Sequence, residues 1–324
     1  MKVQLNILKL VYPPISNQEA EWLKDVPEVR EELKHSNLYM IGQRAESKFD
    51  ISQQAIERIN NSYELSFKYR VGSAFSDVTV DFNKLFKYHN INPNQYKIAI
   101  DVGEKIIRVW KCHPETMEPI GVIEWFTTEK LLFCKWQEHP AIAGLNSYRD
   151  FTKYYLHYIG ISKKEDSLTR LVVKPHDKRI RILSNESPES HGSRVTDEII
   201  LFFFRISPLR VTTIESEEDI NELVNGVVFD KQRIIADAEK AFVRILESKY
   251  NTTRFSEYPK GTDGLYDTGL KRYGYVIGED ISFIADSQDI IGSYSSDKKF
   301  PKHADLILSE GEQVALIKYK SGYT

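Results

Sequence analysis

A helix and a hairpin near the end of the sequence place the strongest constraint on its fold. The stretch 230–250 carries apolar residues at helical spacing, namely Ile234, Ile235, Ala238, Phe242, Ile245 and Leu246. Asp230 stands where it can cap this helix. Two apolar runs follow, 305–308 and 314–320, separated by a turn at 309–313. The last third of the chain is therefore predicted to hold an amphipathic helix and a β-hairpin.

Helices and strands alternate in the preceding part. Ser16 and Glu19 have the spacing of a capping box, which predicts a helix to about Leu33 that Pro27 breaks or kinks. Further helices are expected over 49–60 and 150–159. Strands are expected over 63–71, 97–102, 106–110, 120–126, 131–136, 168–174, 179–183 and 281–285. The apolar run 198–206 fits a buried strand or a buried helix.

The chain has 324 residues, enough for two domains, and 41% hydrophobic residues, enough for a sizeable core. A weak turn signal at Asn225-Gly226 divides it into an N-terminal α+β domain, 1–225, that senses or regulates, and a C-terminal domain, 226–324. It has no 18-residue apolar stretch, and its two cysteines do not suit a secreted disulfide scaffold. We expect no membrane partner and a cytoplasmic location.

The hairpin carries residues that suggest chemistry. Asp305 leads its first strand, and Lys318 and Lys320 share one face of the second. Together with Glu239 on the helix, the segments Pro301-Lys302-His303-Ala304-Asp305 and Ile317-Lys318-Tyr319-Lys320 resemble the PD-(D/E)xK nuclease superfamily. The likeness covers roughly the last 95 residues of the sequence. The layout also resembles the Shedu-type anti-phage nucleases.

The resemblance implies an α/β restriction-endonuclease-like domain that hydrolyses DNA with Mg²⁺ or Mn²⁺ and assembles as a homo-oligomer. Mg²⁺ requires oxygen ligands, which Glu239 and Asp305 would supply. Asp305, the residue at position 318 and Lys320 would form the catalytic set, with Lys320 acting on the attacking water. Four residues before the hairpin would hold the DNA backbone, namely Lys298, Lys299, Lys302 and His303.

Position 318 departs from the family pattern, because it holds lysine where a carboxylate is expected. An ammonium group has no lone pair for a metal. Three readings remain open: an inactive nuclease, a domain that binds nucleic acid without cutting it, or a carboxylate supplied by Glu310, Glu312 or Asp297. The sequence also ends four residues after Lys320, whereas the family core continues, so the domain is expected to be truncated, or completed by another element or by another copy of the chain.

Each feature also has a purely structural interpretation. Paired lysines on a strand often form a solvated face or guard a sheet edge. Glu239 beside an apolar stripe is often a surface residue, and Asp305 could simply end a strand. The basic stretch 174–181 either contacts phosphates or forms a solvated loop. A non-enzymatic binding protein and a protein with no nucleic-acid role therefore remain alternatives to a nuclease. The histidines show no zinc-site spacing, and no P-loop is present.

Overall fold

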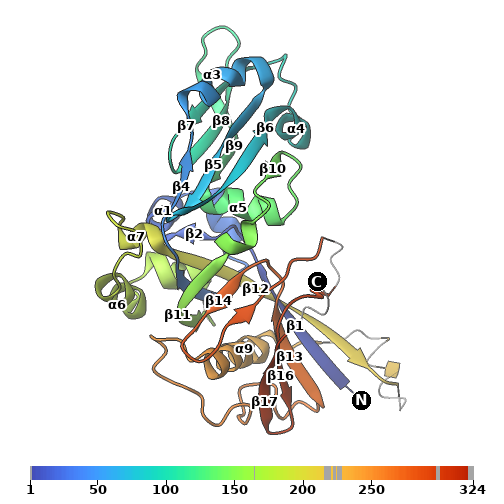
Figure 1. Ribbon diagram of the computed structural model, residues 1–324. Coiled ribbons are helices and arrows are strands. Elements are labelled where there is room, and N and C mark those ends of the chain that lie inside the picture. The colour runs from blue at the N-terminus through green and yellow to red at the C-terminus, as the bar shows by residue number, and fades with distance from the viewer. Residues whose placement is uncertain are drawn as a thin grey trace. The chain divides into compact units, whose positions relative to one another are not determined.

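The computed structural model describes residues 2–163, 165–214, 220–221, 224, 228–296 and 300–319. The chain forms two compact units (Figure 1). The first comprises residues 1–44, 153–187 and 195–324, and the second comprises 45–152 and 188–194. The chain therefore enters the second unit at residue 45, returns to the first at 153, and adds 188–194 to the second before it completes the first.

A mixed sheet, with ten strands among the described residues, forms the first unit. The strands across it are β15 (Ile290–Ile291), β14 (Ser282–Ile284), β11 (Lys153–Ile161), β3 (Leu38–Gln43), β12 (Ile199–Thr212), β1 (Lys2–Leu10), β13 (Arg272–Ile277), β16 (Leu306–Glu310) and β17 (Gln313–Ile317), with β2 (Ile15–Ser16) paired to β12. β1 is parallel to β13, and β11 is parallel to β14. The neighbouring pairs otherwise run antiparallel.

Both faces of this sheet are covered at β12, which explains its continuous apolar run. Its first six residues are all buried. Phe202 meets the rings of Tyr154 and Phe283 at centroid distances of 4.8 and 5.0 Å. Phe203 points to the opposite face and belongs to a core cluster that includes buried residues from several helices. These helices are α1 (Asn17–Leu23), α2 (Pro27–Leu33), the π-helical turn η2 (Thr169–Val173) and α6 (Asp177–Asn185).

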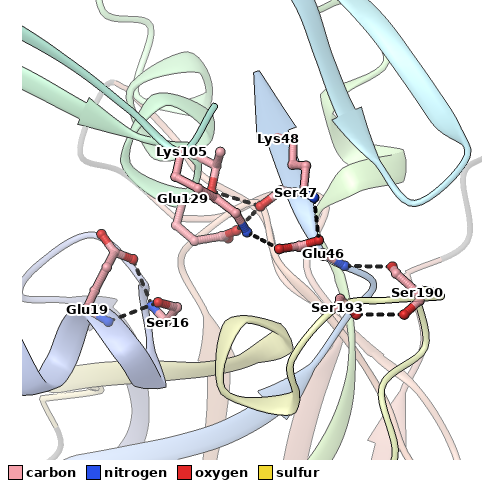
Figure 2. A network of polar contacts seen from close by, with 10 residues as sticks. Ser16, Glu19, Glu46, Ser47, Lys48, Lys105, Glu129, Ser190 and Ser193 are labelled. Carbon is pink, nitrogen blue, oxygen red and sulfur yellow. Dashed lines mark hydrogen bonds and ion pairs between the residues drawn. The ribbon is translucent and has the colours of Figure 1, made fainter. Parts of the chain in front are cut away.

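The start of α1 is fixed by a capping box, as the sequence predicts. The Glu19 N–H donates to Ser16 Oγ at 3.1 Å, and the Ser16 N–H donates to Glu19 Oε2 at 2.9 Å (Figure 2). These two bonds satisfy N–H groups that have no partner within the helix. Pro27 occupies the first turn of α2. The predicted break is therefore confirmed, and it separates two short helices.

The helix α9 (Lys231–Leu246) contacts β11 as well as the hairpin of β16 and β17. The Asp230 side chain caps it by accepting the N–H groups of Gln232 and Arg233 at 3.0 and 3.1 Å. Its sixteen residues span about 24 Å. That length matches the roughly 24 Å across the five strand spacings from β11 to β16. The predicted amphipathic helix is confirmed, and it runs across the sheet.

The second unit contains two antiparallel sheets. One has the order β10 (Ile142–Gly144), β6 (Ala74–Asp81), β5 (Glu64–Val71), β4 (Ser47–Asp50); the other is β7 (Lys97–Val102), β8 (Ile106–Cys112), β9 (Pro119–Thr127). Its helices are α3 (Gln53–Ser62), α4 (Phe82–Tyr88), α5 (Thr128–Trp136) and the 3-10 turn η1 (Tyr148–Phe151). Figure 2 shows Glu46 between Lys48 and Lys105, at 3.0 and 2.5 Å. These pairs tie β4 to the loop before β8.

Several predicted elements are wrong. Residues 131–136 form α5 rather than a strand, because Thr127 Oγ1 accepts the Lys130 N–H at 3.3 Å and starts a helix. Residues 153–161 form β11 rather than a helix, held between β3 and β14. Residues 179–183 lie in α6, where His176 Nδ1 caps the helix by accepting the Arg179 N–H at 3.2 Å. The short helix expected from residue 49 begins at Gln53, since Phe49 belongs to β4.

The mixed α/β class is confirmed, but the two units do not follow the predicted division at 225. Residues 225 and 226, on either side of that boundary, lie outside the described residues. The difference comes from the sheet: β1, β3, β11 and β12 precede the predicted boundary, and β13 to β17 follow it. Six residues of β13 pair with β1. The C-terminal strands therefore share their sheet, and their core, with the N-terminal strands.

We predict that the segment 226–324 does not fold alone, because removing β1 would expose the ladder hydrogen bonds of β13. Circular dichroism and NMR amide dispersion of the purified segment would test this. The matched control is the segment 45–152, which contains all the strands of both sheets of the second unit. Well-dispersed amide signals from 226–324 would contradict the prediction.

Candidate functional site

The hairpin register, which the sequence left open, places Asp305 opposite Lys318. Leu306 pairs with Ile317 and Ile307 with Leu316, so the next positions outward are 305 and 318. Lys318 Nζ lies 3.4 Å from Asp305 Oδ2. The structure thus brings together two of the predicted site residues. They form an ion pair, whereas the family motif would place two carboxylates here.

The carboxylate of Asp305 is fully buried and directed at the main chain. Its Oδ1 accepts the Tyr319 N–H at 2.7 Å, and its Oδ2 accepts the Ile291 N–H at 2.9 Å. The ammonium of Lys318 also donates to the carbonyl oxygen of Asp289. Mg²⁺ needs several oxygen ligands directed at one open position. The groups around Asp305 are mainly hydrogen-bond donors, so these residues do not fit Mg²⁺ or Mn²⁺.

Glu239 lies on α9 in a different environment. Burial raises the pKa of Glu239 to about 7, against the opposing effect of Lys163 and Arg170. The charged groups that act most on Glu239 are Lys163, Arg170, Lys240 and Asp263, and Asp305 is not among them. The two predicted metal ligands thus lie in different electrostatic surroundings.

The predicted DNA-contacting residues are only partly within the described chain. Lys302 and His303 are exposed just before Asp305. The His303 ring meets the Tyr319 ring edge to face, with centroids 4.8 Å apart. Lys298, Lys299 and Lys320 lie outside the described residues. Lys302 and His303 thus lie close to Asp305 in the sequence, and the His303 ring contacts the residue whose N–H bonds to Asp305.

The turn of the hairpin does not supply a replacement carboxylate. Glu310 pairs with Arg272 at 2.7 Å, and Glu312 pairs with Lys260 at 2.9 Å. Both lie at the end of the hairpin away from Asp305, because β16 separates Asp305 from Glu310 by about 17 Å of extended chain. Asp297 lies outside the described residues. Neither glutamate can share a metal ion with Asp305.

Sequence reasoning missed a second buried acid, Asp237 on α9. It is 0% exposed and accepts bonds from the Leu265 N–H at 2.7 Å and the hydroxyls of Tyr258 and Tyr275, both at 2.8 Å. A Cβ on Gly264 would lie 2.4 Å from Asp237 Oδ2, so only glycine fits there. The sequence could have indicated a buried acid here, because Asp237 stands next to Ala238 in the apolar stripe. It could not have indicated the tyrosine partners, because they are distant in sequence.

The spacing of the histidines in the sequence also gave no sign of a cluster in the second unit, formed by His89, Glu124 and His139. One ligand atom of each lies within 4.8 Å of the others. Glu124, however, already accepts Lys130 Nζ at 2.6 Å. His139 Nδ1 accepts the Ala141 N–H at 3.2 Å, so the hydrogen of its neutral ring is on Nε2. In that tautomer the nitrogen has no lone pair for a metal. Glu124 also lies 3.1 Å from His89 Nε2, whereas His139 Nε2 is buried and has no hydrogen-bond partner among the described residues. The cluster is therefore an ion-pair group around Glu124 with one unpartnered ring nitrogen beside it.

Comparison of the chain with protein-family models, curated proteins and solved structures finds no match. The likeness to the nuclease superfamily therefore rests on the residues themselves. None of the helices formed by the described residues is long and apolar enough to cross a membrane.

We predict that Asp305→Ala lowers the free energy of unfolding by about 2–4 kcal/mol, because it leaves two buried N–H groups without acceptors. Urea denaturation would measure the loss. The control is Glu312→Ala, an exposed ion-pair carboxylate, with an expected change within about 0.5 kcal/mol. If the free energy of unfolding is unchanged or higher, the carboxylate is not a structural hydrogen-bond acceptor. That result is expected if Asp305 is a metal ligand and the protein contains no metal.

A second prediction follows from Glu239. Because its pKa is raised, the folded protein keeps a proton that the unfolded chain releases between about pH 4.5 and 7. The contribution of this group to stability is therefore full below pH 4.5 and is lost as the pH rises through about 7, by up to ~3 kcal/mol.

Glu239→Gln should remove that part of the pH dependence, seen as a smaller difference between the urea midpoints at pH 5 and pH 8. Glu257→Gln, at an exposed loop position, should keep the parental difference. If Glu239→Gln also keeps it, the carboxyl group is not held protonated by burial.

Proposed function

We propose that the chain binds nucleic acid without cutting it, and that its C-terminal hairpin is the remnant of a metal-dependent nuclease site. The observation that supports this most directly is the environment of Asp305. Its carboxylate is buried, bonded to two main-chain N–H groups and paired with Lys318. The active-nuclease interpretation, including the Shedu-type anti-phage role and homo-oligomer, requires a carboxylate that is free for Mg²⁺.

Lys318 opposes metal binding in two ways. Its ammonium neutralises the one carboxylate available, and its positive charge would repel a divalent cation at about the same position. The same charge favours a phosphate group. Lysine binds phosphate as a point charge, without the planar geometry that arginine imposes. A lysine in place of an acid at this position therefore lowers the affinity of the site for a cation and raises its affinity for an anion.

The surface around Asp305 suits a nucleic-acid strand. Lys302 is exposed, and the side chain of Lys318 is 43% exposed. Tyr319 is 40% exposed, with its ring held against His303. Proteins that bind single strands combine cations for the backbone with aromatic rings on which bases stack. The net charge of −3 gives no attraction from the chain as a whole, so binding would depend on such local groups.

The test measures binding and cleavage on the same proteins. Fluorescence anisotropy with labelled single-stranded and duplex DNA should show binding whose log Kd rises linearly with log salt. Tyr319→Ala should weaken single-strand binding about fivefold or more, through lost stacking. Lys302→Ala should weaken binding and reduce the salt slope. The charge-matched control is Lys231→Ala, an exposed position at the start of α9.

Plasmid DNA incubated with Mg²⁺, Mn²⁺ or EDTA should stay intact with the parent protein and with Lys318→Glu, since Asp305 remains bonded to Ile291 and Tyr319 in both. If Lys318→Glu nicks the plasmid with metal and the parent protein does not, the lysine at position 318 is all that prevents catalysis. The proposal that the hairpin is only the remnant of a nuclease site would then be overturned. If no DNA binds at low salt, the proposed nucleic-acid function is wrong.

A further inference from the structure

A pocket of about 280 Å³ lies between α6 and the loop that follows α9, both in the first unit. Its lining combines three cations with an amide, a phenol and a hydroxyl: Lys178, Arg181, Asn185, Lys249, Tyr250 and Thr252. Two of the cations come from the basic stretch 174–181. The strand predicted over 179–183 is instead part of α6, and the helix fixes the side of the molecule on which these charged side chains lie.

The helix α6 separates its basic residues onto two faces. Arg179 points inward and is 9% exposed; its guanidinium donates to Asn17 Oδ1 at 2.6 Å and to Glu21 Oε1 at 2.7 Å. Lys178, Arg181 and Asn185 are spaced i, i+3 and i+7, which places them on one face of a helix. The buried anchor therefore fixes the rotation of α6 and presents the other two cations together.

The opposite wall is a tightly held loop. The Tyr250 N–H donates to the His157 carbonyl at 2.9 Å. Asn251 bonds to both main-chain groups of Ile159, accepting its N–H at 2.9 Å and donating to its carbonyl at 2.8 Å. These bonds attach the loop to β11. Lys249 and Thr252, on either side of the anchored residues, are thus presented from a rigid backbone.

The pocket has an excess of positive charge. Lys249 pairs with Glu186 at 2.7 Å, and the Tyr250 hydroxyl donates to the same carboxylate. The described part of the chain places no carboxylate within 4.0 Å of Lys178 or Arg181. In two other pockets most cations are paired with an acid, namely Lys240 and Lys260 in one and Lys48 and Arg70 in the other, while Arg254 in the first donates to the Ser248 carbonyl. Three cations and one glutamate leave a local charge of about +2, by simple count of the ionised groups.

We propose that this pocket binds a terminal phosphate group, carried either by a mononucleotide or by the 5′ end of a nucleic-acid strand. A phosphate monoester has a charge of about −1.5 to −2 at pH 7, which matches the excess in the pocket. The Arg181 guanidinium offers a fork of donors for two phosphate oxygens, and Lys178 adds a point charge. The Asn185 amide and the Thr252 hydroxyl can donate to the remaining oxygens. The strand-end source rests on the proposed nucleic-acid function, whereas the mononucleotide source does not.

The first experiment titrates the full chain with inorganic phosphate and with a nucleoside 5′-monophosphate, by isothermal titration calorimetry. One site is expected. Arg181→Ala and Lys178→Ala should each weaken it about tenfold or more, as expected for lost charge-assisted bonds. Arg181→Lys should recover only part of the loss, and Lys231→Ala should bind like the parent. Circular dichroism confirms that each variant is folded.

The second experiment compares one oligonucleotide with a 5′-phosphate or a 5′-hydroxyl. If the 5′-phosphate tightens binding by the parent protein but not by Arg181→Ala, the pocket binds the phosphate at the strand end. If the monophosphate binds but the 5′-phosphate does not tighten oligonucleotide binding, the pocket binds a mononucleotide. That conclusion stands even if the Tyr319 and Lys302 variants show no nucleic-acid function. The proposal is overturned if no phosphate probe binds, or if Arg181→Ala and Lys178→Ala bind as tightly as Lys231→Ala.

Discussion

The parallel pairing of β1 with β13 is the contact on which the rest of the first unit depends. Without it, the sheet would separate into a group around β12, which also holds β14 and β15, and a group formed by β13, β16 and β17. The pairing is supported by buried polar side chains: Gln4 Nε2 donates to Asn6 Oδ1 at 2.8 Å, and Asn6 Nδ2 donates to the Gly274 carbonyl at 3.3 Å. Because these groups are buried, a shifted register would leave them unsatisfied. The contact therefore fixes both the pairing and its alignment.

Local signals in the sequence were sufficient for elements with their own caps or periodicity. The capping box at Ser16, the break at Pro27, the cap at Asp230 and the apolar stripe of α9 all appear as predicted. The prediction failed where tertiary context decides. Residues 153–161 became a strand because β3 and β14 offer edges to it, and β1 reaches β13 across most of the chain. No local pattern encodes such distant pairing.

For the site, the sequence indicated the right positions but not their chemistry. It placed Asp305 and Lys318 near each other, and the register brings them to 3.4 Å. It could not show that the N–H groups of Ile291 and Tyr319 occupy the carboxylate, because one of them comes from β15 on the far edge of the sheet order. Asp237 and Asp280 follow the same scheme, accepting the N–H groups of Leu265 and Tyr294 at 2.7 Å. Buried carboxylates in this unit thus anchor loops.

Some exposed cations of the first unit have no acid beside them. Of the buried acids, Asp305 pairs with Lys318, whereas Asp237 pairs with no lysine or arginine among the described residues. Lys302 near the hairpin, and Lys178 and Arg181 on α6, have no ion-pair partner among the residues that the structure describes. A chain with a net charge of −3 can therefore still present two local positive surfaces. Lys302 lies in the turn just before β16, whereas Lys178 and Arg181 lie on α6, whose rotation Arg179 fixes through Asn17 and Glu21, so that an anion at α6 would meet preorganised charges.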